Sequence, residues 1–244
     1  MRTLLLSLGT SAVLLSPLAH AADLDIVEAP MAGDFSGAYV AARIAGAFSP
    51  DTNFNLTVVP TNIINDYEQL GFGGALAVGY EFGLGSNIAL RGELEGGLIS
   101  TEVKSHTLAA LATTLSGAAA FGTTEITYGM VNAAVDYDFG NGFKPFVSGG
   151  IGLAEVNFKN HGVGLAAPVG PLGPGNVTAM NDKDSGLAWQ IGGGVGYAID
   201  EQVTLEAGYR YFQVNDINLT AVDGTVTNVP IKQHQVMLGV RYGF

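Results

Sequence analysis

The sequence predicts an all-β protein, an eight-stranded antiparallel up-and-down transmembrane β-barrel with short periplasmic turns and long extracellular loops. Two observations carry this prediction. Apolar residues alternate with small or polar residues in eight segments of ~10 residues or somewhat more, the length that a tilted strand needs to cross a bilayer. Long and short connections also alternate along the chain, as they do in an outer-membrane barrel.

The alternating segments define the strands in chain order. They cover residues 35–48, 71–82, 88–99, 127–139, 143–154, 186–199, 203–212 and 235–244. In the third segment Leu90 and Leu94 alternate with Arg91 and Glu93, so that one face is apolar and the other is polar. The phase of the fourth segment is unclear before Met130, which a β-bulge at that point would explain. The last segment would fray unless a neighbour held it on both sides, which pairing with the first strand provides.

The connections form a second, independent pattern. The long ones cover residues 49–69, 100–123, 157–184 and 213–229, and the short ones cover residues 83–87, 140–142 and 200–201. All short turns therefore lie at one end of the sheet, together with both chain termini. We expect no regular structure in residues 161–175 and a solvated turn at residues 181–184. The spacing of Leu108, Leu111 and Leu115 leaves open a short helix or a mobile loop.

Aromatic residues cluster near the short turns and the C-terminus. They are Tyr80, Phe82, Tyr137, Phe139, Phe143, Tyr197, Tyr242 and Phe244. Such a cluster predicts an aromatic girdle at the periplasmic interface of a membrane barrel. A soluble lipocalin-like barrel could show the same alternation with its apolar face inward, but it would need no aromatic belt at one rim.

The N-terminus is typical of a secretory signal. Arg2 precedes a short apolar run, and Ala19 and Ala21 form an A-x-A cleavage site. We therefore expect a signal peptide over residues 1–21, a short periplasmic segment over residues 22–34 and the barrel over residues 35–244. Without Arg2, nine Lys and Arg residues face 22 Asp and Glu residues, which disfavours nucleic acid as a partner. The chain has no cysteine, so it offers no thiolate for zinc or catalysis.

Three stretches carry a resemblance to a known family. The sequences FSGAYVAARIAG at residues 35–46, VTLEAGYRYF at residues 203–212 and VRYGF at residues 240–244 resemble small outer-membrane β-barrel proteins of the opacity and OmpA-like superfamily. The resemblance covers about residues 35–244. It implies that Phe244, with Tyr242 and Val240, belongs to the signal read by the barrel-assembly machinery. Because nothing follows Phe244, we expect no peptidoglycan-binding domain.

Nine charged residues fall on the predicted lumen face. They are Arg43, Glu81, Arg91, Glu93, Glu95, Asp136, Glu206, Arg210 and Arg241. Charges inside a narrow barrel must pair or be hydrated, so we interpret them as an ion-pair network that plugs the lumen. A narrow, charge-lined conduit is the alternative. Eight strands argue against it, because side chains fill a barrel of that diameter.

The histidines of the predicted mature chain, His106, His161 and His234, fall at or beyond the external ends of strands, where we expect exposed side chains. Some eight-stranded barrels are lipid A-modifying enzymes, but no histidine here has a serine and an acid in an obvious set. We therefore expect no catalytic site, no cofactor and no metal site.

The predicted function is a structural or surface-interaction role in the outer membrane, performed through four extracellular loops. The alternatives are a narrow channel for small or apolar solutes and, less favoured, a lipid A-modifying barrel enzyme. The expected partners are outer-membrane lipid and lipopolysaccharide, the barrel-assembly machinery, and a host or surface ligand bound by the loops. We expect a monomer.

Overall fold

The computed structural model of the chain describes residues 36–56, 61–66, 70–85, 87–108, 112–165 and 175–244. The predicted signal peptide, its cleavage site at Ala19 and Ala21, and the segment 22–34 lie outside these residues. Within the described ranges, no helix is both long enough and apolar enough to cross a bilayer.

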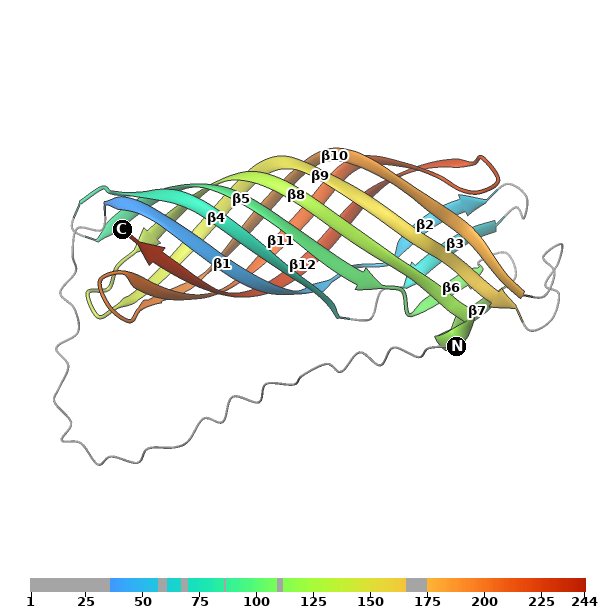
Figure 1. Cartoon of the computed structure of the whole chain (residues 1–244), viewed down its shortest axis with the longest axis horizontal. Coiled ribbons are helices and arrows are strands. Elements are labelled where there is room, and N and C mark those ends of the chain that lie inside the picture. Colours follow the sequence, from blue (N-terminus) through green and yellow to red (C-terminus); the bar gives the residue numbers. More distant parts are fainter. Residues whose placement is uncertain (1–35, 57–60, 67–69, 86, 109–111, 166–174) are drawn as a thin grey trace, which may run out of the picture.

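Eight strands close into the predicted antiparallel barrel, in the order β1-β12-β11-β10-β9-β8-β5-β4 (Figure 1). They are β1 (Gly37–Phe48), β4 (Gly71–Gly83), β5 (Ile88–Glu102), β8 (Ala120–Tyr137), β9 (Phe143–Leu165), β10 (Gly175–Ala198), β11 (Val203–Thr220) and β12 (Val226–Gly243). The first strand pairs with the last from Tyr39 opposite Gly243 to Phe48 opposite His234. The ring is thereby closed and leaves no unpaired edge along this seam.

A second, four-stranded sheet lies at one end of the barrel. It consists of β2 (Thr52–Leu56), β3 (Thr61–Asp66), β6 (Ser105–Leu108) and β7 (Thr113–Ser116), in the order β2-β3-β6-β7, and a short 3₁₀ helix, η2 (Gly117–Ala119), follows β7. This end, which we call the sheet end, is opposite the C-terminus (Figure 1). The three short turns and the C-terminus define the other end, which we call the turn end. The possible helix at Leu108 to Leu115 is wrong, because Leu108 lies in β6 and Leu115 in β7; Leu111 lies outside the described residues.

The strands are longer than predicted, and two of the expected long loops are mostly strand. β9 continues to Leu165 and β10 begins at Gly175, while β11 continues to Thr220 and β12 begins at Val226. The prediction failed because the apolar face changes sides in these extensions. Val156 and Phe158 are buried inside, whereas the outward neighbours Glu155 and Lys159 are polar and meet water. Lipid-facing alternation therefore ends before the strand does.

Residues 181–184 are part of β10 and not a solvated turn. The carboxylate of Asp182 accepts a hydrogen bond of 2.7 Å from the backbone N–H of Thr220, and that of Asp184 accepts one of 2.7 Å from the N–H of Asn218. The regular pairing of β10 with β11 ends where Ala188 lies opposite Val214, before these aspartates are reached. The two aspartates therefore satisfy backbone donors of β11 that the regular ladder leaves free.

The apolar side chains of the barrel face outward, which overturns the lipocalin-like alternative. Leu76 is 70% exposed and Ile44 is 67% exposed. The eight aromatic residues of the predicted girdle are all exposed at the turn end, and several are in ring contact, with centroids 4.5 Å apart for Tyr80 and Phe82 and 5.3 Å apart for Tyr242 and Phe244. This arrangement is the one expected of a barrel whose outer wall meets lipid.

A bulge interrupts β8, but not at the predicted place. Burial alternates regularly from Thr124 through Met130 to Tyr137. The register with β9 shifts instead between Phe121 and Thr123, around Gly122, whose φ of 151° favours glycine. The unclear phase in the sequence reflects the apolar and small residues on both faces near Met130.

Candidate functional site

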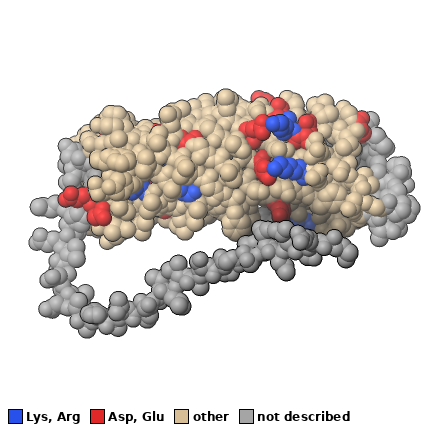
Figure 2. Space-filling model, in the orientation of Figure 1, with Lys and Arg blue, Asp and Glu red and all other residues tan. Residues whose placement is uncertain are grey.

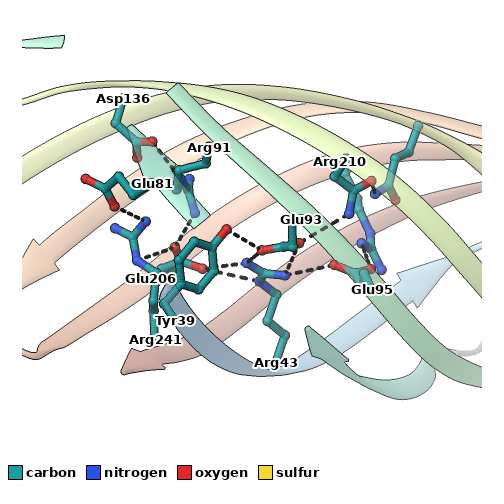
Figure 3. Close-up of polar contacts among 12 residues, drawn as sticks. Tyr39, Arg43, Glu81, Arg91, Glu93, Glu95, Asp136, Glu206, Arg210 and Arg241 are labelled. Atoms are coloured by element: carbon teal, nitrogen blue, oxygen red, sulfur yellow. Dashed lines mark hydrogen bonds and ion pairs between the residues drawn. The ribbon is translucent and has the colours of Figure 1, made fainter. Parts of the chain in front are cut away.

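All nine predicted charged residues lie inside the barrel, and Figure 3 labels them together with Tyr39. They come from six strands: Arg43 from β1, Glu81 from β4, Arg91, Glu93 and Glu95 from β5, Asp136 from β8, Glu206 and Arg210 from β11, and Arg241 from β12. No ionised side chain among the described ion pairs of this group is more than 10% exposed. Alternation along each strand sends these positions inward.

Arg43 is the centre of one half of this lumen network. Its guanidinium forms a bidentate pair with Glu93, with Nη1 to Oε1 and Nη2 to Oε2 distances of 2.7 Å each. Nη1 also donates to Glu95 Oε2 at 2.8 Å, and Nη2 donates to Glu206 Oε2 at 3.1 Å. One cation therefore holds three carboxylates from two strands that are not its neighbours in the sheet.

Glu206 connects the second half of the lumen network to the first. Its Oε1 accepts a hydrogen bond of 3.0 Å from Arg91 Nη1 and lies 3.6 Å from Arg241 Nε. Arg91 Nε donates to Asp136 Oδ2 at 2.6 Å, and Arg241 Nη1 donates to Glu81 Oε2 at 3.0 Å. The pairs thus span the lumen from several sides (Figure 3). Four arginines against five carboxylates leave the nine residues with a formal charge of −1.

Neutral side chains complete the lumen network, and these were missed in the sequence. Arg210 donates to Glu95, to Gln235 and to the hydroxyl of Tyr128, each at 2.5 Å. The hydroxyl of Tyr39 donates to Glu93 at 3.1 Å. Asn132 also donates to Glu93, and Gln190 donates to Asn132. The alternation along the strands predicts that these side chains face inward, but the network predicted from the sequence included charged residues alone.

A layer of apolar side chains fills the lumen between the lumen network and the sheet end. Its fully buried members are Ile99, Ile126, Val156, Phe158, Phe212, Val214, Ile217 and Leu219. The ring of Phe212 meets that of Tyr128, 5.2 Å between centroids, where the two layers join. A cavity of about 40 Å³ among the polar side chains has room for a few waters. The interior thus consists of a polar layer near the turn end and an apolar layer beyond it.

Two of the histidines are buried, so the expectation of exposed side chains is wrong for them. His106 is 1% exposed and His161 is 2% exposed, with ring centroids 6.2 Å apart. His106 Nε2 lies 3.1 Å from the carbonyl oxygen of Phe121, and His161 Nε2 lies 3.2 Å from Thr124 Oγ1. They join β6 of the second sheet to β8 and β9 on the sheet-end side of the apolar layer. Burial lowers the pKa of His106, and burial followed by the charge of His106 lowers the pKa of His161 to about 3.

Charged side chains on the outer wall gather towards the sheet end in the view of Figure 2. Lys159 Nζ lies 2.6 Å from Glu125 Oε2, and Lys183 Nζ lies 3.0 Å from Glu155 Oε2. All four side chains are more than 40% exposed. These pairs mark the level at which the outer wall passes from lipid to water.

Comparison with known proteins agrees with this architecture. A family model described as the outer membrane protein beta-barrel domain matches residues 9–244. The outer membrane protein PagN of Salmonella typhimurium is 24% identical over 233 residues, which cover 85% of this chain and 90% of PagN. Opacity protein V28 of Neisseria gonorrhoeae is 28% identical over 127 residues, which cover 47% of this chain and 50% of that protein.

Among solved structures, the crystal structure of Neisserial surface protein A superimposes with a TM-score of 0.52 at 19% identity, covering 86% of this chain and 98% of that one. The resemblance seen in the sequence to small outer-membrane barrels of the opacity type is confirmed. The chain belongs to the family of outer membrane protein β-barrel domains, and its place is the outer membrane.

Proposed function

We propose that the protein is a monomeric, non-catalytic barrel with a closed lumen that presents an interaction surface at its extracellular sheet end. The observation that carries the proposal is the two-layered interior. A hydrated solute would have to separate ion pairs such as Arg43 with Glu93, and then displace the fully buried ring of Phe212. Each of these steps is costly inside a narrow barrel.

The sheet end supports an interaction role because it has regular strands and a packed core beyond the lipid-facing part of the barrel. Strands β8 to β12 extend beyond the lipid-facing part of the outer wall, and their buried side chains continue the apolar core. The second sheet lies against these strands through contacts of β2 with β12 and of β6 with β8. Backbone hydrogen bonds such as Val103 N–H to Gly122 O, at 3.0 Å, tie the two parts together. A partner would meet a preformed surface, which lowers the ordering cost of binding.

The remaining parts of the proposal concern biogenesis. Residues 1–21 act as a cleaved export signal, and residues 22–34 form a short periplasmic segment. Phe244, with Tyr242 and Val240, serves the barrel-assembly machinery. The N–H of Phe244 donates to the carbonyl oxygen of Ala38 at 3.0 Å, and its ring is 76% exposed and free for recognition.

Two experiments test the proposal. In planar bilayers the purified, folded protein is expected to give no conductance steps; steady single-channel conductance would establish the channel alternative. For the interaction role, cells that express the protein are compared with cells in which residues 105–116, the β6 and β7 hairpin, are replaced by a short Gly-Ser turn. Adherence to epithelial monolayers is expected to fall while heat-modifiability is kept. Equal adherence would remove the interaction role.

A further inference from the structure

A cluster of aromatic side chains lies on the outer wall near the sheet end, on three neighbouring strands. Trp189 of β10 and Tyr211 of β11 have ring centroids 5.3 Å apart, and Tyr211 and His234 of β12 have centroids 5.4 Å apart. His234 also stacks on Tyr209 at 6.1 Å, and its Nδ1 lies 2.6 Å from the Tyr209 hydroxyl. The rings form one continuous platform that faces away from the lumen.

Polar groups border this platform on the side of the sheet end. The hydroxyl of Tyr211 donates to Gln213 Oε1 at 2.8 Å, and Gln213 Nε2 donates to Asn215 Oδ1 at 2.6 Å. Lys232 is the register partner of Gln213 on β12 and is exposed. Among the described residues no carboxylate lies within ion-pair distance of Lys232, whereas Lys159 and Lys183 both have one. The platform therefore has an available cation beside hydrogen-bonding amides.

The platform lies where the outer wall changes from apolar to polar. On the turn-end side, the exposed side chains next to it are Ile191 and Val236. On the other side come Asn215 and Asn218. At this level acyl chains give way to headgroups. A general aromatic girdle would account for rings alone, and the girdle at the turn end contains Phe82, Phe139, Phe143 and Phe244. Here every ring carries a polar atom and a lysine stands beside them.

We propose that this platform binds a phosphorylated amino-sugar headgroup of an outer-leaflet glycolipid, the chemistry of lipid A. A pyranose ring presents a face of C–H groups that packs on Trp189 and Tyr211, and its hydroxyls meet the amides of Gln213 and Asn215. Lys232 binds the phosphate as a point charge. The acyl chains run along Ile191 and Val236 into the apolar belt. The site is on the outer wall and does not depend on the interaction role of the sheet end.

Trp189 is the only tryptophan of the chain, so its fluorescence reports on this site alone. The detergent-solubilised full-length protein is titrated with lipid A in mixed micelles of a detergent without a sugar headgroup. Phosphatidylglycerol supplies a phosphate without a pyranose, and an alkyl glucoside supplies a pyranose without a phosphate. A saturable shift is expected with lipid A, at concentrations at which neither comparison lipid produces one.

Three variants distinguish binding of lipid A at the platform from its non-specific uptake into the micelle. Lys232→Gln is expected to weaken lipid A binding about tenfold, since it removes a charge-assisted contact. Gln213→Leu is expected to weaken it as well. Lys159→Gln serves as the matched control and should keep wild-type affinity. Lys159 lies away from the platform and is paired with a carboxylate of β8. All three positions are on the outer wall and leave the lumen unchanged.

Wild-type affinity in both Lys232→Gln and Gln213→Leu would overturn the proposal. So would an equal response to phosphatidylglycerol, which would reduce the site to a general attraction for anionic lipid. Conductance and adherence are not expected to change in these variants, so failure of this site and failure of the proposed function are distinguishable.

Discussion

Tyr128 lies over Gly97, its cross-strand partner, so closely that a Cβ on the glycine would overlap with the phenol ring carbon Cζ. The same relationship holds between Tyr39 and Gly79, which also pair across neighbouring strands. In both cases the hydroxyl joins the lumen network, to Arg210 from Tyr128 and to Glu93 from Tyr39. A glycine opposite each tyrosine lets the ring lie flat against the wall.

Gly97→Ala is therefore expected to destabilise the barrel by about 1–3 kcal/mol, because the ring of Tyr128 must move and its contact with Arg210 is disturbed. The measurement is guanidinium unfolding in detergent, followed by the fluorescence of Trp189. Gly92→Ala is the matched control on the same strand, since nothing lies within 4 Å of its Cβ position. Equal stability of the two variants would contradict the proposed close packing.

Arg43→Met is expected to cost about 3–5 kcal/mol, because it leaves Glu93, Glu95 and Glu206 inside the barrel without their shared cation. Lys159→Met breaks an ion pair on the water-exposed outer wall and is expected to cost about 0–1 kcal/mol. Unfolding midpoints of the two variants in the same detergent test this contrast. Similar losses would mean that the lumen network contributes no more than a surface pair.

Charge on the lipid-facing wall should be most harmful at mid-depth. Leu94 lies midway along the outward face of β5, whereas Leu90 is next to the turn end. Leu94→Arg is expected to cost about 2–4 kcal/mol, and Leu90→Arg less, because an interfacial arginine reaches the headgroups. Refolding yield and stability in lipid vesicles give the comparison. A larger loss at Leu90 would place the bilayer elsewhere on the wall.

Acid should loosen the junction between the second sheet and the barrel. An unfolded histidine has a pKa of about 6.5. In the folded protein the pKa of His161 is lowered to about 3, so the unfolded form binds more protons between these values. Stability from neutral His161 is thus complete above about pH 6.5 and falls as the pH drops, by about 2 kcal/mol at pH 5. Hydrogen exchange of the β6 and β8 amides at pH 7 and pH 5 measures it.

His161→Gln should remove most of this pH dependence, and His106→Gln should reduce it, since the pKa of His106 is lowered in the same direction. His234→Gln serves as the control, because His234 is only half-buried and lies on the outer wall. A slope that survives in His161→Gln and His106→Gln would assign the acid sensitivity to other groups.

The barrel could be predicted from the sequence because successive side chains of a strand face lipid and lumen in turn, which gives an alternation of apolar and polar residues with a period of two. Leu90 and Leu94 alternate with Arg91 and Glu93, which separates the two faces of the strand, and the aromatic residues near the short turns indicate that the apolar face is the outer one. The members of the lumen network followed from that choice. Their pairing did not, because Arg43 meets Glu93 across strands whose relative stagger is set by closure of the whole ring.

The sheet end was predicted poorly for the opposite reason. At the sheet end the outer wall meets water, so the apolar residues Val156 and Phe158 point inward, whereas the apolar Leu94 in the lipid-facing part points outward. The apolar face of the strand therefore changes from outer to inner without a break in the chain. His106 and His161 were expected to be exposed because they fall at or beyond the external ends of the predicted strands. Their burial depends on the second sheet, whose strands come from two connections that are distant along the chain.

The strand extensions at the sheet end also decide how the outer surface of this end can change over evolutionary time. Glu155 and Lys159 alternate with Val156 and Phe158 along β9, so solvent contacts one set while the core depends on the other. Substitutions at these outward positions are expected to change stability by no more than about 1 kcal/mol. The outer surface at the sheet end can therefore change one residue at a time, with no insertion or deletion and without alteration of the fold that displays it.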